Sequence, residues 1–268
     1  MPNLEGSDFR RDSSRVSAVH AGIRAAIGWL ADVMMPPLCL ACHTPLASKN
    51  AICADCWRNI DFIRPPLCDR LGIPLPYDAG SGAISAEAAA SPPVYARARA
   101  VARYDGVMRD LIHDMKFHDR HDARALFGRW MCEAGAGLIA DADILVPIPL
   151  HRMKLLRRRF NQSSFLAIEI AAITGLPVAH LALVRSRATQ SQIGLTREQR
   201  RLNVRGAFEV PTRHRALIAG RRALIVDDVI TTGATVTAAS RALLDAGATA
   251  VDVLALGLVT DATATLLA

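Results

Sequence analysis

The sequence predicts an α/β protein with a doubly wound, mostly parallel sheet and helices on both faces, preceded by a small N-terminal four-cysteine zinc module. Two observations predict this fold class. Short apolar runs typical of buried parallel strands alternate with helical patterns between Ala98 and Val259. Ahead of them, two Cys-x-x-Cys pairs have the spacing of a tetrahedral thiolate site. A chain of 268 residues can bury one such domain and carry a small appendage.

The bulk composition excludes two classes of protein. Six cysteines are too few for a disulfide scaffold, and no apolar run reaches the roughly 20 residues that a membrane span needs. Val16–Met35 follows several arginines, as a signal peptide would, but Arg24 and Asp32 interrupt it. Residues 1–35 are therefore expected to form a disordered start and an amphipathic helix in a cytoplasmic protein. The 32 lysines and arginines against 25 acidic residues fit anionic ligands, either phosphates or nucleic acid.

The two cysteine pairs lie in a zinc-binding module that is predicted over residues 36–71. Each pair lets two thiolates approach one ion, and two pairs complete a closed structural site for one zinc. Two redox pairs or unrelated thiols are the alternative. Cys68 looks like half of a further pair whose second position is Leu71, and the Gly-, Ala-, Ser- and Pro-rich residues 72–96 are interpreted as a linker. The expected zinc ligands are Cys39, Cys42, Cys53 and Cys56.

The core domain is expected over residues 97–268. Its strands are apolar runs that end at turn residues, and its helices carry apolar residues at helical spacing. The expected strands are Ala98–Tyr104, Asp143–Pro149, Pro177–Val184, Ala207–Val210, Ala223–Val226 and Val251–Val259. The expected helices are Val107–Lys116, Ala123–Leu138, Ser163–Ile173 and Val236–Ala246.

The core domain is organised around one run, in which the apolar strand Ala223–Val226 leads into Asp227, Asp228 and a threonine-rich turn. This turn leaves backbone N–H groups unpaired ahead of a helix N-terminus, which is an arrangement that binds phosphate. Open α/β sheets place ligands at the carboxyl ends of their strands, so the two carboxylates are expected to accept hydrogen bonds from the hydroxyls of a phosphorylated sugar. The alternative is an ordinary strand–turn–helix whose acids cap the helix. The turn residues are Thr231, Thr232, Gly233, Ala234 and Thr235.

This run resembles the phosphoribosyl diphosphate (PRPP) binding signature of the type I phosphoribosyltransferases, with four hydrophobic residues, two acids and a T-T-G-x-T turn. The resemblance implies that Asp227 and Asp228 hold the ribose hydroxyls and that Thr231–Thr235 hold the 5′-phosphate. It also implies magnesium bound with PRPP, and it makes Lys116 and Arg159 candidates near the diphosphate.

A basic loop follows the expected strand Asp143–Pro149 at the same edge of the sheet. It carries five cations between Arg152 and Arg159. Because the planar guanidinium binds phosphate oxygens in pairs, these cations are expected to stabilise a departing diphosphate. A solvated loop, or one that grips nucleic acid, is the alternative. The polar residues from Arg185 to Arg205 are interpreted as a lid that brings further cations over the site.

The order of motifs resembles the ComF family of bacterial competence-associated proteins, which are amidophosphoribosyltransferase-like. After the cysteine pairs come L-I-H-x-M-K-F (Leu111–Phe117), V-P-I-P, R-F-N-Q, R-x-T-x-x-Q, R-x-x-N-V and V-D-D-V-x-T-T-G. Two departures stand out. Leu71 and the Ala/Ser-rich stretch replace further zinc cysteines, which favours one metal. Thr231 stands where purine-salvage phosphoribosyltransferases carry an acid, so no carboxylate general base is available there and a purine acceptor is not favoured.

The sequence therefore predicts a PRPP-binding, phosphoribosyltransferase-like protein of the ComF family, linked to competence and DNA uptake. Whether it turns over as a glycosyltransferase, and whether it forms a homodimer, is left open. The alternative is a non-catalytic accessory of the competence machinery that binds single-stranded DNA, with PRPP as a regulatory ligand or absent. Aromatic residues scattered along the sequence argue against a stacking platform for bases: Trp57, Phe117, Trp130 and Phe160.

Overall fold

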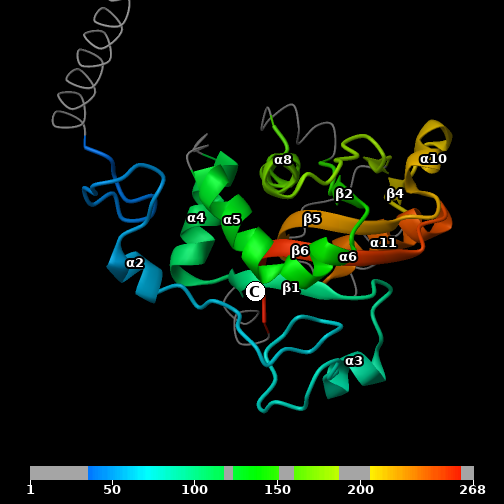
Figure 1. The fold of residues 1–268 in the computed structure, drawn as a ribbon, viewed down its shortest axis with the longest axis horizontal. Coiled ribbons are helices and arrows are strands. Elements are labelled where there is room, and N and C mark those ends of the chain that lie inside the picture. Colours follow the sequence, from blue (N-terminus) through cyan, green and yellow to red (C-terminus); the bar gives the residue numbers. More distant parts are fainter. Residues whose placement is uncertain (1–35, 118–122, 151–159, 187–205, 261–268) are drawn as a thin grey trace, which may run out of the picture. The chain divides into compact units, whose positions relative to one another are not determined.

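A computed structural model describes residues 36–117, 123–150, 160–186 and 206–260, which form two compact units (Figure 1). The first unit ends at Cys53, and its described part is a short loop closed by a bridge between Leu38 and Pro45. The second unit begins at Ala54 and contains all the helices and strands of the described chain.

The second unit is built on a parallel four-stranded sheet in the order β1-β6-β5-β2 (Figure 1). β5 lies between β6 and β2, and its residue Val226 is opposite Leu254 of β6 and Pro147 of β2. The central strands are apolar on both sides, as expected where both faces are covered. The strands are β1 (Ala98–Arg103), β2 (Ile144–Pro147), β5 (Arg222–Ile230) and β6 (Ala250–Leu258).

Helices cover both faces of this sheet. Ala223 and Ile225 of β5 share one core with Val236 and Leu243 of α11. The alternate residues of β5 point to the opposite face, where α5 and α8 contact each other and the sheet. The principal helices are α4 (Gly106–Phe117), α5 (Arg124–Ala134), α8 (Gln162–Thr174) and α11 (Ala234–Asp245). The predicted fold class, an α/β protein with a parallel sheet between helices, is confirmed.

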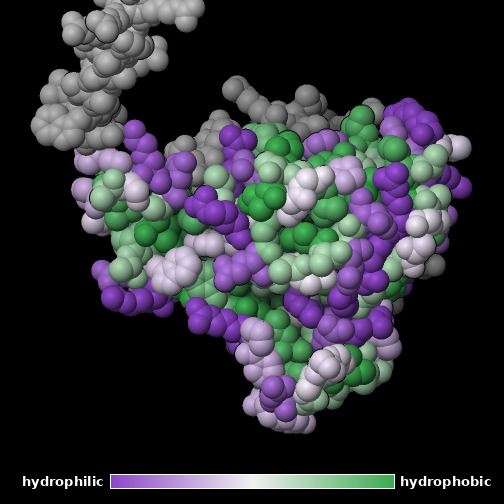
Figure 2. Space-filling view, viewed as in Figure 1, coloured by the Kyte–Doolittle hydropathy of each residue, from purple (hydrophilic) through white to green (hydrophobic). Residues whose placement is uncertain are grey.

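The remaining elements are short. β3 and β4 form a separate antiparallel pair. Within the described residues, no helix is both long and apolar enough to span a membrane, and hydrophilic and hydrophobic residues are interspersed on the face shown in Figure 2. These elements are α2 (Ala54–Arg58), α3 (Ala86–Ala90), α6 (Ala136–Asp141), β3 (Val184–Arg185), β4 (Phe208–Glu209), η2 (Thr212–His214) and α10 (Arg215–Ile218).

Three predicted elements differ from the structure. The helix expected over Ala123–Leu138 is divided at Gly135, where a Cβ atom would lie 2.7 Å from Cδ2 of Leu254. The strand expected over Pro177–Val184 is reduced to one bridge at Val178 and the two residues of β3. The central strand does not stop before the acidic pair, because β5 keeps its pairing with β6 as far as Ile230.

A buried ion cluster holds the amino-terminal end of the sheet. Asp252 of β6 is fully buried and accepts hydrogen bonds from Arg222 of β5 at 2.7 and 3.1 Å. Arg97, which precedes β1, donates to the same carboxylate at 3.0 Å and to Asp141 at 2.8 Å. A buried carboxylate is tolerated when its charge is matched in this way.

Replacing Asp252 by Asn is therefore expected to lower the free energy of unfolding by about 3 kcal/mol, because two arginines lose their shared counter-charge. Urea unfolding followed by circular dichroism measures this change. Asp245→Asn, at the exposed end of α11, is the control and should change the stability by less than about 0.5 kcal/mol. Equal effects of the two substitutions would contradict this role for Asp252.

Candidate functional site

The acidic pair occupies a part of β5 that extends beyond its neighbour β2. The last paired residue of β2, Pro147, lies opposite Val226, and Ile148 donates its N–H to the Val226 carbonyl at 3.0 Å. Beyond this point β5 remains paired with β6 alone, with Asp227 opposite Ala255. Among the described residues, no strand pairs with the edge of β5 that faces away from β6 at the level of the two aspartates.

Asp227 points toward the start of α8 and is only 7 % exposed. The Ser163 hydroxyl donates to Asp227 Oδ1 at 3.1 Å, and the Asp228 N–H donates to the same oxygen at 2.9 Å. Burial, together with the neighbouring Asp228 charge, raises the pKa of Asp227 to about 7, although these two donors and Lys116 oppose the shift. Asp227 can therefore change its protonation state near neutral pH.

Asp228 has a different environment. Its side chain is 17 % exposed, and its Oδ2 lies 2.9 Å from Nζ of Lys116. Lys116 stands in the last turn of α4, so the fold brings together two residues that are far apart in the sequence. The outer carboxylate and the ammonium group neutralise each other beside the buried Asp227.

The threonine-rich turn joins β5 to α11. The N-cap residue of this helix provides no side-chain hydrogen bond to the first N–H groups of the helix. Gly233 is the N-cap residue, with φ +72° and ψ 0°, a left-handed conformation that favours glycine. A Cβ at this glycine would meet no atom within 4 Å, so the space above the turn is open among the described residues. The buried Thr232 Oγ1 has no hydrogen-bond partner there, and Thr231 is exposed. An anion placed at this turn would satisfy these donors.

The structure adds residues that the sequence analysis did not assign to the site. Asn161 donates from Nδ2 to the Ile148 carbonyl at 2.9 Å and so holds the chain where it leaves β2. Gln162 is 1 % exposed, and its Nε2 is buried without a partner among the described residues. Both belong to the R-F-N-Q motif, which supports the resemblance to the ComF family but was not assigned to the site. Ser163 follows them, and sequence analysis placed it only in a buried helix.

Parts of the predicted site lie outside the described residues. These are Arg159 with the rest of the basic loop over residues 151–159, and most of the predicted lid, over residues 187–205. Arg185 lies at the described start of that stretch, and burial lowers the pKa of its guanidinium while the charge of Asp227 opposes this shift.

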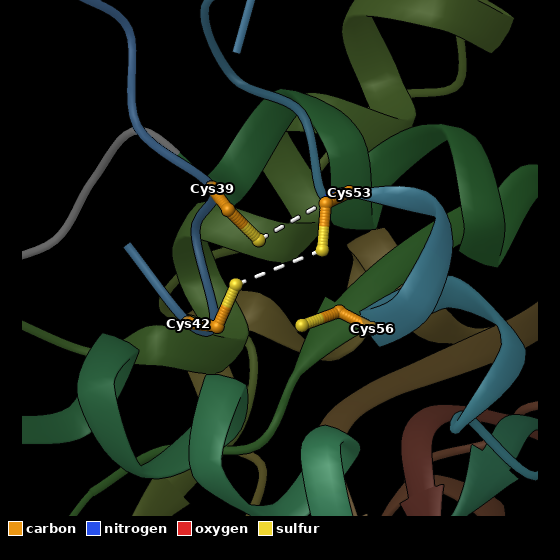
Figure 3. A group of neighbouring side chains, drawn as sticks. All are labelled: Cys39, Cys42, Cys53 and Cys56. Atoms are coloured by element: carbon orange, nitrogen blue, oxygen red, sulfur yellow. Dashed lines mark hydrogen bonds between the residues drawn. The ribbon is translucent and has the colours of Figure 1, made fainter. Parts of the chain in front are cut away.

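The four predicted zinc ligands converge on one point (Figure 3). All their Sγ atoms lie within 4.8 Å of one another, and those of Cys42 and Cys53 are 3.6 Å apart. Tetrahedral zinc with bonds of about 2.3 Å separates its sulfur ligands by about 3.8 Å, so this donor set fits the ion. Burial raises the pKa of the Cys39 thiol, but backbone donors at Cys42, Cys53 and Ala41 outweigh it and lower the pKa, which favours the thiolate. This cluster of four cysteines supports one structural zinc.

Comparison with known proteins defines both parts of the chain. Residues 30–87 match the family model of the double zinc ribbon domain, and residues 162–261 match that of the phosphoribosyl transferase domain. The protein is therefore a phosphoribosyltransferase-fold protein with an N-terminal zinc ribbon.

Relatives of known name identify the family. The chain is 33 % identical over 229 residues to the DNA utilization protein YhgH of Salmonella typhi, an alignment of 82 % of this chain and 96 % of the relative. It is 32 % identical over 228 residues to YhgH of Escherichia coli K12, with the same coverage. Competence protein F of Haemophilus influenzae is 27 % identical over 215 residues, or 78 % of this chain and 91 % of that protein. The chain belongs to this family of YhgH and competence protein F proteins, the ComF family.

Solved structures of phosphoribosyltransferases also align with the chain. The glutamine PRPP amidotransferase of B. subtilis, complexed with ADP and GMP, is 27 % identical with a TM-score of 0.34, over 49 % of this chain. The alignment spans only 27 % of the amidotransferase. The orotate phosphoribosyltransferase of Mycobacterium tuberculosis in complex with PRPP is 21 % identical with a TM-score of 0.31, over 56 % of this chain and 72 % of that enzyme.

Because the pKa of Asp227 is raised, we expect the effect of Asp227→Asn on the free energy of unfolding to depend on pH. The unfolded aspartate loses its proton near pH 4 and the folded one near pH 7, so the free energy of unfolding of the wild type falls as pH rises between these values. Asn avoids this loss, and the variant should be more stable than the wild type by about 2–4 kcal/mol at pH 8. The difference should shrink toward pH 4.

Denaturant unfolding at a series of pH values checks this expectation. The exposed Asp245→Asn serves as the matched control, because it removes the same charge without removing a buried group. A stability difference that does not grow with pH beyond that of the control would show that Asp227 ionises freely in the folded protein.

Proposed function

We propose that this protein binds PRPP together with Mg²⁺ at the carboxyl end of β5. The observation that carries the proposal is the juxtaposition of Asp228, partly exposed, with a turn whose Thr232 hydroxyl is buried and unpartnered. A phosphate at the turn and a ribose beside the acidic pair would use both features. The phosphoribosyl transferase family match over residues 162–261 supports the same ligand.

The two aspartates are proposed to play different parts in ribose binding. Asp228 is the more exposed carboxylate and is placed to accept hydrogen bonds from the ribose hydroxyls. Asp227 is buried against Ser163, so in this geometry it orients the strand and adds charge behind Asp228. Mg²⁺ prefers oxygen ligands, and the Asp228 carboxylate fits this preference. When bound, the ion would neutralise diphosphate charge.

Lys116 is proposed as a residue that exchanges partners when PRPP binds. Its ammonium group pairs with Asp228 at 2.9 Å and can turn toward an oxygen of the diphosphate, because lysine is a point charge on a flexible stem. Arg159, on the basic loop, is proposed as a second diphosphate contact and a catalytic cation. Transfer of the phosphoribosyl group, with diphosphate as leaving group, is the reaction that this arrangement would serve.

The names of the relatives extend the proposal to a cellular role. YhgH is named for DNA utilization, and competence protein F for competence. We propose a related role for this protein, in which a cytoplasmic PRPP-binding protein takes part in the use of DNA that enters the cell.

One observation bears on the alternative, in which the protein binds single-stranded DNA by base stacking. Trp57 and Phe62 form one cluster with Trp130, which is distant in the sequence, and the ring centroids are 4.7–5.7 Å apart. Trp130 is 6 % exposed, however, and Phe62 is half-buried, whereas Trp57 is 43 % exposed, so one ring of the cluster is exposed and the cluster is not a platform. This arrangement favours packing over base stacking.

Isothermal titration with PRPP and Mg²⁺ tests the proposal. Wild-type protein should release heat on binding, and Thr232→Val should weaken the affinity by about 10-fold or more, because the phosphate loses a hydroxyl donor while the side chain keeps its shape. Asp228→Asn should weaken binding, because it replaces one of the two acceptor oxygens offered to the ribose hydroxyls by a donor and removes the negative charge.

The matched control is Thr249→Val, an exposed threonine that precedes β6, and it should bind as the wild type does. The absence of heat with the wild type, or equal affinity in wild type and Thr232→Val, would contradict the proposed site. Binding of a single-stranded oligonucleotide that weakens with salt, without binding of PRPP, would favour the alternative.

A further inference from the structure

Residues 65–90, which follow the zinc ribbon, repeat its sequence pattern. Pro-Pro-Leu-Cys begins both segments, at residues 36–39 and 65–68, and a proline closes each loop at the same spacing. Later in each segment, A-I-C-A-D-C (51–56) corresponds to A-I-S-A-E-A (83–88). The ligand positions Cys39, Cys42, Cys53 and Cys56 thus correspond to Cys68, Leu71, Ser85 and Ala88.

The backbone of the two loops is also the same. In each loop the first cysteine donates its N–H to a carbonyl five residues later, at 2.8 Å in both cases. The residue four positions after that cysteine returns an N–H to the cysteine carbonyl and is left-handed, with φ 60° at His43 and 68° at Gly72. A β-bridge closes each loop, between Leu38 and Pro45 and between Leu67 and Pro74.

The second half of each segment matches as well. The Cys53 N–H donates to Cys39 Sγ at 3.3 Å, and the Ser85 N–H donates to Cys68 Sγ at 3.2 Å. A helix of five residues begins directly after each of these donors, α2 after Cys53 and α3 after Ser85. Residues 65–90 therefore have the fold of a zinc ribbon.

The donor set of this second ribbon does not fit zinc. Leu71 and Ala88 carry no ligand atom. The Ser85 hydroxyl accepts the Ala88 N–H at 3.2 Å as the N-cap of α3, which leaves Cys68 as the one thiolate where four are needed. The family model that matches residues 30–87 describes a double zinc ribbon, but the second segment carries a cysteine at only one of the four positions that correspond to the zinc ligands of the first.

Contacts with β1 and the core take the place of the metal. Leu71 packs with Leu67 and Ile73 against the hydrophobic core of the sheet. Arg99 of β1 donates to the Asp69 carboxylate at 2.7 Å and to its carbonyl at 2.8 Å. These contacts give the segment an apolar face and charge-assisted hydrogen bonds, which the first ribbon obtains from thiolates around an ion.

We propose that residues 65–90 are a metal-free second ribbon, held by packing on β1, and that the chain binds a single zinc, at the first ribbon. The segment predicted as a linker over residues 72–96 is then largely a part of this ribbon. Removal of zinc affects the first ribbon and leaves the second folded.

Restoring the missing ligands tests the proposal. The triple variant Leu71→Cys, Ser85→Cys, Ala88→Cys should bind two zinc ions per chain in native mass spectrometry, whereas wild type binds one. The matched control Leu71→Ser, Ala88→Ser keeps Ser85, changes the other two positions without adding a thiolate, and should bind one. Two zinc ions in the wild type, or a folded triple variant that binds one, would overturn the proposal.

Hydrogen exchange on the wild type gives a second test that requires no engineered ribbon. After a chelator removes zinc, the amides of residues 39–53 should lose protection, while those of Cys68, Gly72 and Leu75 should keep it. Arg99→Met should produce the reverse pattern, with lower protection in residues 65–90 and unchanged zinc content. Loss of protection in both ribbons on chelation would show that the second ribbon also depends on metal.

Discussion

The candidate site depends on the unequal lengths of two neighbouring strands. The V-P-I-P sequence ends β2, because Pro147 and Pro149 lack N–H donors and fix the backbone as the chain leaves the sheet. β5 continues on the support of β6 alone. In the described part of the chain, the start of α8 contacts the other edge of β5 at Asp227, while Asp228 stays partly exposed. A longer β2 would cover this edge, so the prolines are as necessary to the site as the aspartates.

Charge distribution at this edge follows from the same geometry. Asp227 is covered by α8 and favours its neutral form, whereas Asp228 reaches Lys116 at the end of α4. In the proposed site, Asp227 would therefore have a structural role, and Asp228 would exchange Lys116 for the ligand. Two adjacent acids in the sequence become chemically distinct because successive residues of a strand point to opposite sides.

The sequence predicted the fold class, the zinc ligands and the place of the acidic pair at the carboxyl end of a strand, because these signals are local, within a strand, a turn or a pair of cysteines. It did not predict the contact of Ser163 with Asp227, since residues distant in the chain meet only after folding. The extension of β5 was missed because two aspartates resemble a strand end. The sequence analysis recognised Cys68 and Leu71 as the remains of a further cysteine pair. It interpreted residues 72–96 as a linker, because the hydrogen bonds that relate this segment to the first ribbon leave no cysteine signature.

The central claim is that the turn after β5 holds a sugar phosphate beside the acidic pair. Backbone amide NMR of ¹⁵N-labelled protein titrated with ribose 5-phosphate tests it most directly, with ribose as the matched ligand. The account predicts that the amides of Gly233, Ala234 and Thr235 shift with ribose 5-phosphate and remain unchanged with ribose at the same concentrations. Saturable binding of ribose 5-phosphate that leaves these three amides unshifted would contradict it.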